Sequence, residues 1–249
     1  MGTPSDLTSE VTRHGRTDVR AAVLSMSARS PDRQDADYLE WHGLDHLPEQ
    51  YRISALRSGC RWVSTPACRA ARAASAARFD DADHVVAYLF ADPLRAGLDT
   101  FFDLGADLRA VGRMPLRLPM VELAGYELTD TAAASRSLVG GDVLPWRPAR
   151  GVYVLIEDGE PVRIDPLLEV PGVAGAWTYL GTGSLHPRLA STDGLRLSLL
   201  YLDDDPPTVA RALVDELDRR WRSGTTSPLL AAPFVTVVPW AWAAALPGP

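Results

Sequence analysis

The segment DHVVAYLFADP (residues 83–93) is an apolar run that stops at Asp and Pro, and it recurs as GLRLSLLYLDDD (residues 194–205). Short apolar runs bounded by turn-forming residues are typical of strands. Each run is followed by apolar residues at helical spacing, over 94–112 in the first case and 206–224 in the second. The chain therefore contains two copies of a strand–helix block.

The repeat extends to both sides of this block. Further segments match as pairs, in chain order 19–28 with 151–158, 58–64 with 174–181, and 119–128 with 233–243. With a helical segment after the first strand of each half, both halves have the order strand, helix, strand, strand, helix, strand. That order is the βαββαβ unit of ferredoxin-like folds.

A single unit of this kind has helices on one face of its sheet and leaves the other face bare. Two units can cover each other by closing their sheets into one barrel. We therefore predict an α+β protein in which two tandem ferredoxin-like halves, residues 19–128 and 151–245, form a pseudodimeric α+β barrel. Residues 1–18 are expected to be a flexible N-terminus and residues 129–150 a linker. Two separate domains are the alternative.

Composition limits the partners of the chain. The net charge of −7 argues against nonspecific binding to nucleic acid. The chain has no lysine, which excludes a lysine Schiff base and a Walker A loop. No apolar run approaches the roughly 20 residues of a membrane helix, and the N-terminus lacks an apolar signal core. We expect a cytoplasmic protein with a small-molecule ligand and neither a nucleic-acid nor a membrane partner.

The segment YLEWHGLDHLPEQYR (residues 38–52) holds two of the five histidines. We expect Asp35 to cap a helix that Pro48 ends or redirects. At helical spacing one broad face of this helix carries Tyr38, Trp41, His42, Asp45, His46 and Glu49. An imidazole changes its charge near neutral pH, so this face suits general acid/base chemistry.

Several interpretations of these residues remain open. In the functional one, His46 exchanges a proton with a ligand and His42 assists, whereas in the structural one His46 bonds a backbone carbonyl. The helix dipole favours a protonated His46, and desolvation favours a neutral one. His42 and His46 at i and i+4, with Asp45, also match a metal clip, but a bare pair is common by chance and we expect no metal. We expect His84 to lie near solvent at a strand end.

The pattern Trp41-His42, His46, Pro48, followed by Arg61-Trp62, resembles the dimeric α+β barrel superfamily, and within it the EthD-like branch. The resemblance covers residues 19–128 well. It covers 151–243 more weakly, because the second half has Pro171-Gly172-Val173 but lacks the Trp–His helix.

The resemblance implies an enzyme without a cofactor that acts on a small apolar metabolite, as a lyase, isomerase, cyclase or oxygenase. His46 and His42 would be catalytic, and Tyr38, Trp41 and Arg61 would contact the substrate. Members of the superfamily form dimers, so this chain is expected to be a monomeric pseudodimer or a homodimer. The fold also hosts haem proteins and proteins without known activity. The alternative is therefore a non-catalytic protein that binds a small ligand or a partner.

Overall fold

The structure is a computed structural model that describes residues 17–222 and 224–246. Apart from its last two residues, the flexible segment expected at 1–18 lies outside the described residues. The first half contains β1 (Val19–Ser27), α2 (Asp35–Trp41), the π-helical turn η1 (His42–His46), α3 (Leu47–Gln50), β2 (Leu56–Val63), α4 (Pro66–Ala70), β3 (Ala74–Ser75), η2 (Ala77–Phe79), β4 (His84–Ala91), α5 (Leu94–Ala110) and β5 (Met120–Ala133).

The second half has the same order with a much shorter first helix. It follows η3 (Gly141–Trp146) and contains β6 (Gly151–Gly159), α6 (Asp165–Leu168), β7 (Val173–Leu180), β8 (Leu195–Leu202), α7 (Pro206–Trp221) and β9 (Thr226–Thr236). The last strand was expected at 233–243, which is wrong by several residues. Residues 226–235 pair with β6. The apolar segment after Thr236 forms no strand, although the Val237 amide donates to the Arg61 carbonyl of β2 at 3.3 Å.

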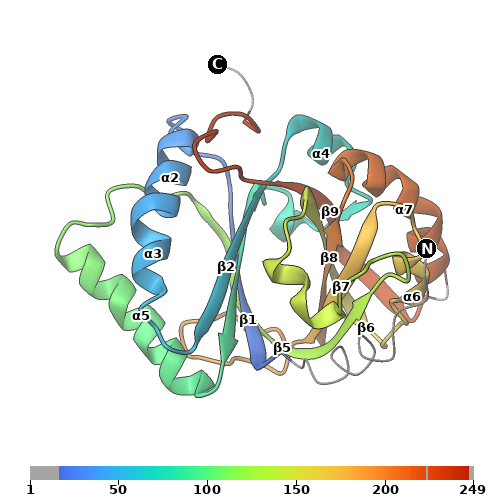
Figure 1. The fold of residues 1–249 in the computed structure, drawn as a ribbon, viewed down its shortest axis with the longest axis horizontal. Helices are drawn as coiled ribbons and strands as arrows, with labels where there is room; N and C mark the ends of the chain where they lie inside the picture. Colours follow the sequence, from blue (N-terminus) through green and yellow to red (C-terminus); the bar gives the residue numbers. More distant parts are fainter. Residues whose placement is uncertain (1–16, 223, 247–249) are drawn as a thin grey trace.

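The strands form one sheet in the order β2-β4-β1-β5-β7-β8-β6-β9, and an additional pairing of β2 with β9 closes it. Across the sheet, the four strands of each half lie side by side in the order second, third, first, fourth. The fourth strand of each half therefore pairs with the second strand of the other half. Figure 1 shows α2, α3 and α5 along one side of the strands and α7 along the other. This arrangement confirms two ferredoxin-like halves that close one barrel.

The two junctions between the halves differ in length. β5 pairs with β7 from Glu127 to Ala133, which takes the strand into the range expected for the linker. β9 pairs with β2 only at Trp62 and Val63, and β9 also pairs with the short strand β3. The edge of β2 before Trp62 consequently has no strand partner on this side in the described chain. We call this edge the β2 seam.

Apolar side chains fill the inside of the barrel. Among the side chains that are fully buried there are Trp177, Tyr126, Phe234, Leu24 and Met26. Two further apolar layers lie between the sheet and the helices, one against α5 and one against α7. A small barrel packed in this way leaves no open channel along its axis.

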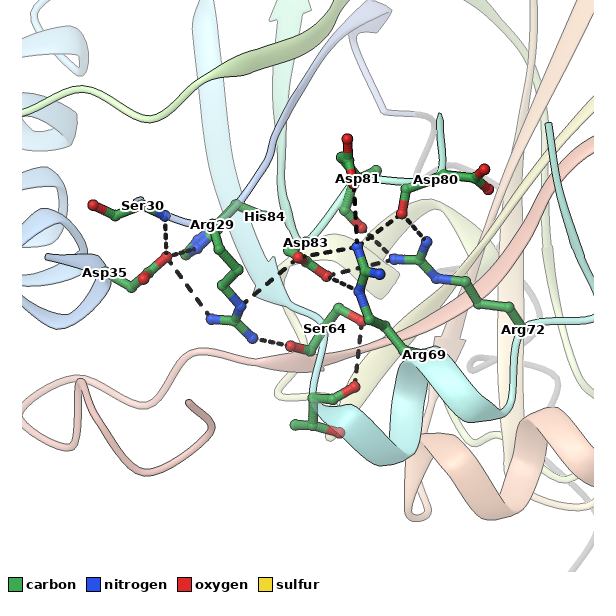
Figure 2. Close-up of polar contacts among 12 residues, drawn as sticks. Arg29, Ser30, Asp35, Ser64, Arg69, Arg72, Asp80, Asp81, Asp83 and His84 are labelled. Carbon is green, nitrogen blue, oxygen red and sulfur yellow. Dashed lines mark hydrogen bonds and ion pairs between the residues drawn. The ribbon is translucent and has the colours of Figure 1, made fainter. Parts of the chain in front are cut away.

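A buried ionic network joins β1, α2 and β4 at one end of the first half (Figure 2). Arg69 Nε donates to the Asp83 carboxylate at 2.7 Å. Guanidinium nitrogens of Arg72 and Arg29 lie 3.7 and 3.9 Å from the same carboxylate. Figure 2 also shows Asp35 between the Ser30 backbone and the His84 ring.

Two sequence expectations about this network are wrong. Asp35 accepts from the Ser30 amide at 3.1 Å and lies 2.7 Å from His84 Nε2, so its carboxylate does not cap the helix. His84 is 1% exposed, so it is not near solvent. The reason is the same in both cases. Asp35 and His84 bind each other although they are 49 residues apart in the sequence, and no local pattern shows this contact.

Candidate functional site

One bent helix carries the residues that the sequence singled out. α2, η1 and α3 follow one another without a break from Asp35 to Gln50. Proline has no amide hydrogen, so Pro48 disturbs the ordinary helical bonding. The turn before it widens to a π-helix, in which the Leu47 amide donates to the His42 carbonyl. Pro48 therefore lies inside the helix. Of the two outcomes expected for it, the end of the helix is wrong, whereas a redirected helix fits the π-helical turn before Pro48.

The inner face of this helix packs against the outer face of β2 and β4. The Nε2 atom of His42 lies 2.9 Å from the hydroxyl of Tyr88 on β4. Arg61 on β2 donates from Nη2 to the Tyr38 hydroxyl at 3.2 Å, and its Cζ lies 4.9 Å from the centre of that ring. The helix thus meets both strands through polar side chains.

His46 and Trp41 occupy the next turn of the same face. Their rings stack with centroids 5.0 Å apart and planes 19° apart. The Nε2 atoms of His46 and Gln50 are 3.0 Å apart, so His46 bonds to a side chain and not to a backbone carbonyl. The structure consequently brings the predicted site residues together in one cluster.

Sequence reasoning missed two members of this cluster, Tyr88 and Gln50. Gln50 follows His46 by one helical turn, so the spacing of the motif could have indicated it. Tyr88 lies in a wholly buried strand among apolar neighbours, and no pattern in the sequence distinguishes it. We call Tyr38, Trp41, His42, His46, Gln50, Arg61 and Tyr88 the helix–sheet cluster.

Burial sets the charge of both imidazoles. It lowers the pKa of His42 well below its usual value, and the neighbouring Arg61 charge adds to the effect. For the same two reasons, in the same order, the pKa of His46 falls to about 4. Desolvation therefore outweighs the helix dipole, and His46 also lies a full turn before the helix end. Both rings are neutral at pH 7 and can accept a proton.

A cavity of about 400 Å³ adjoins the cluster. Its wall is made by Leu39, His42, Gly43, Leu44, Leu47, Gly59, Cys60, Arg61, Trp62, Pro145, Arg147, Pro148, Ala149, Tyr201, Thr236, Val237, Pro239 and Trp242. Of the predicted site residues, His42 and Arg61 line the cavity. Tyr38, Trp41 and His46 do not line it and contact these two instead.

The cavity passes around the edge of β2. It touches the consecutive residues from Gly59 to Trp62, whose side chains alternate between the two faces of the sheet. The cavity therefore lies along the β2 seam. Tyr201, which points into the barrel layer, forms part of the far wall.

The segment after β9 closes the cavity from outside. In Figure 1 this segment runs from β9 across to the helix that begins with α2. A Cβ atom at Gly43 would lie 3.0 Å from the Trp242 ring, so the indole rests directly on the π-helical turn. The missing side chain at Gly43 makes this close approach possible.

Several buried polar atoms of the cluster lack a hydrogen-bond partner. They are His42 Nδ1, His46 Nδ1, Gln50 Oε1, Arg61 Nε and Arg61 Nη1. Buried polar atoms in native proteins are nearly always satisfied, by protein or by a bound molecule. These five atoms leave hydrogen-bonding capacity in the cluster that a bound molecule could use.

The described residues offer no group of three or more His, Cys, Asp or Glu side chains that could hold a metal ion. Haem ligated by histidine needs a ring nitrogen with open space beyond it. Tyr88 engages Nε2 of His42, and the rings of Tyr38, Trp41 and His46 surround His42 with centroids 5.6 to 6.5 Å away. Because Tyr88 engages Nε2 of His42, that nitrogen does not fit the role of a haem ligand.

No protein-family profile and no curated protein sequence matches the chain. Among solved structures it is similar to a protein provisionally assigned as a chlorite dismutase, with 13% identity, a TM-score of 0.54, and coverage of 91% of this chain and 97% of the other. Two further similar structures are a provisionally assigned monooxygenase from Fusobacterium nucleatum and a variant of chlorite dismutase from Candidatus Nitrospira defluvii. Both are 10% identical and cover 88% of this chain and 92% of the other, with TM-scores of 0.49 and 0.46.

The TM-score of 0.54 with the first of these structures shows a similar fold, and the identity of 13% leaves the activity open. In the described part of the chain, no helix is both long and apolar enough to cross a membrane. The closed barrel of two ferredoxin-like halves agrees with this similarity, which extends over nearly the full length of both chains. The chain has the fold of the dimeric α+β barrel proteins.

Proposed function

We propose that the protein is an enzyme that binds a small, largely apolar ligand in the cavity at the β2 seam and removes a proton from it without a cofactor. The observation that carries this proposal is the wall of the cavity, where a neutral imidazole and a guanidinium stand together. A neutral imidazole accepts a proton, and a guanidinium stabilises the negative charge that remains.

His42 is the proposed proton acceptor because it lines the cavity and His46 does not. In the tautomer whose Nε2–H donates to Tyr88, the Nδ1 atom is an unprotonated acceptor without a partner. The proton passes from the ligand to His42, and its bonding electrons stay on the ligand as an anion beside Arg61. Whether a lyase, isomerase, cyclase or oxygenase reaction follows depends on the ligand.

His46 and Trp41 are proposed to be positioning residues. The His46 ring lies 5.6 Å from the His42 ring and is itself held between Trp41 and Gln50. Tyr38 has the corresponding role for Arg61 through its hydroxyl. This assignment keeps the predicted site residues and moves the proton transfer from His46 to His42.

We further propose that the two halves arose by duplication and that only the first half keeps a site. In the second half α6 has four residues in place of the long bent helix. A buried ion pair lies beneath α7, with Arg220 Nε and Nη2 at 2.7 and 2.8 Å from the two carboxylate oxygens of Glu157. Since one chain closes the whole barrel, the proposed unit is a monomer, with a homodimer as the alternative.

The second candidate function is binding without turnover. The filled barrel and the bond between His46 and Gln50 favour it, because both make the cluster rigid. The two candidates share one cavity and differ only in proton transfer.

Deuterium exchange separates them. Small phenols and enolisable ketones are incubated with the protein in D2O, and proton NMR follows the loss of ligand C–H signals. The wild type should accelerate exchange of at least one bound compound, and His42→Gln should abolish the acceleration. His186→Gln is the matched control, because His186 stacks on Phe102 away from the cavity and should leave the rate unchanged. Equal exchange with and without His42 would contradict the proposed base, and binding without exchange would favour the second candidate.

A further inference from the structure

Arg61 differs from the other arginines that are shielded from solvent. The described arginines that are buried or half-buried are Arg29, Arg57, Arg61, Arg72, Arg147, Arg196 and Arg220. All of these except Arg61 and Arg196 have a carboxylate oxygen within 4 Å. Arg196 donates to the Gly159 carbonyl at 3.1 Å. The Arg61 side chain has one hydrogen bond, to the neutral Tyr38 hydroxyl.

Within residues 17–222 and 224–246, no carboxylate oxygen lies within 4 Å of the Arg61 guanidinium. His42 and His46 are neutral, and they would be positive if they were charged. Asp45 and Glu49 lie on the same bent helix, but each is bound by Arg113 at 2.9 Å. A shielded cation without a counter-ion is costly, and two nitrogens of Arg61 also lack any acceptor. The described part of the chain therefore leaves both the charge and two nitrogens of this side chain unmatched.

We propose that the ligand of the cavity is an apolar monoanion, such as an aromatic or branched carboxylic acid, whose anionic group pairs with Arg61. This inference deepens the proposed function and takes from it the location of the site and the role of His42 as proton acceptor.

The charge count of the wall supports a single negative charge. Arg147 also lines the cavity, but Asp203 already binds it at 2.5 and 2.8 Å. One uncompensated guanidinium matches a carboxylate better than a phosphate dianion. The rest of the wall is mostly apolar and includes Leu44, Leu47 and Trp242, which suits the body of the acid. The body would extend from Arg61 around the β2 seam toward Tyr201.

The bound anion would also change the imidazoles. The Arg61 charge is the second cause that lowers the pKa of His42 and of His46. An anion beside Arg61 cancels this charge, so the pKa of each ring rises toward its usual value. A base is most effective when its pKa approaches the working pH. Binding of the correct ligand would therefore make His42 a better proton acceptor.

The test compares 2-naphthoate with its neutral methyl ester, which has a similar shape. Calorimetry measures the Kd of both probes for the wild type, for Arg61→Gln and for Arg147→Gln. A hydrogen bond to a charged group contributes about 1.5–3 kcal/mol, so the wild type should prefer the acid at least about tenfold. Arg61→Gln should lose this preference and keep its affinity for the ester. Arg147→Gln, the matched control from the same wall, should keep the preference.

A second measurement does not depend on the variants. NMR titration of the histidine rings should show that 2-naphthoate raises the pKa of His46 from about 4 and that the ester leaves it unchanged. Equal affinity for acid and ester in the wild type would overturn the inference and leave the proposed proton transfer intact. Loss of the preference in Arg147→Gln alone would overturn it too, because the anion would then sit elsewhere. Failure of both probes to bind would contradict the cavity itself and with it the proposed function.

Discussion

The imidazole of His42 and the hydroxyl of Tyr88, 2.9 Å apart, form a buried bond between the bent helix and strand β4. Burial raises the pKa of Tyr88, so the phenol keeps its proton and the pair is neutral. The bond fixes the ring that faces the cavity. The orientation of the proposed base therefore depends on a strand residue 46 positions away in the sequence.

Tyr88→Phe should release His42 from this position. We expect a loss of about 1 kcal/mol in the free energy of unfolding, the usual contribution of one hydrogen bond, and a lower exchange rate. Urea unfolding measures the first effect and deuterium exchange the second. Tyr126→Phe is the control, because its buried hydroxyl has no partner and its removal should leave stability unchanged or higher. Equal losses in both variants would show that the bond to His42 contributes nothing.

The protein should lose stability in mild acid. His46 has a pKa of about 4 when folded and about 6.5 when unfolded, so between these values the unfolded chain binds more protons. Stability should fall as the pH drops from about 6.5 to about 4, by about 3 kcal/mol for this residue, and this contribution should level off below that. Urea unfolding across this range checks the slope. His46→Gln cannot be protonated and should show a shallower slope, whereas an unchanged slope would contradict the depressed pKa.

Two glycines of α5 should respond oppositely to alanine. A Cβ at Gly97 would lie 2.5 Å from the Cβ of Ala55, whereas a Cβ at Gly105 would meet nothing within 4 Å. Replacement of Gly by Ala in a helix contributes up to about 1 kcal/mol through propensity. Gly105→Ala should therefore raise the melting temperature, and Gly97→Ala should lower it because the helix must move away from Ala55. A gain in both variants would mean that α5 packs less closely.

Asp83 should be required for stability because three arginines converge on it. Removal of this buried carboxylate in Asp83→Ala leaves Arg72, whose side chain is 8% exposed, without a counter-ion. Breaking a buried pair in this way costs about 3–5 kcal/mol. Asp81→Ala removes a carboxylate that is 82% exposed and lies 3.9 Å from Arg69, so it should change little. Chemical denaturation of the two variants should differ by this amount.

The order of strands and helices expected from the sequence predicted the barrel, with two separate domains as the alternative. Apolar strands that stop at Asp, each followed by an amphipathic helix, occur in the same order in both halves, and order fixes the pairing of a βαββαβ unit. The end of the chain was placed wrongly because its apolar residues read as strand. In the structure Trp242 instead packs on Gly43, a contact between residues far apart in the sequence that a local pattern cannot contain.

The sequence predicted most members of the helix–sheet cluster, missed Tyr88 and Gln50, and did not predict which residues line the cavity. Helical spacing brought His42 and His46 to one face, and the structure keeps them there. Which of the two lines the cavity depends on the π-helical turn and on the β2 seam, and both arise from long-range packing. The charge of the rings depends on burial and on Arg61, which no single segment shows.

The most direct test of the account is the response of the histidine rings to a neutral ligand, which does not depend on the proposed anion. Wild-type protein is titrated with methyl 2-naphthoate, and the ring signals are followed by two-dimensional NMR. The account predicts saturable shifts for His42 and smaller ones for His46, with His186 unaffected. Saturable binding that leaves the His42 ring unchanged would place the ligand elsewhere and contradict the account.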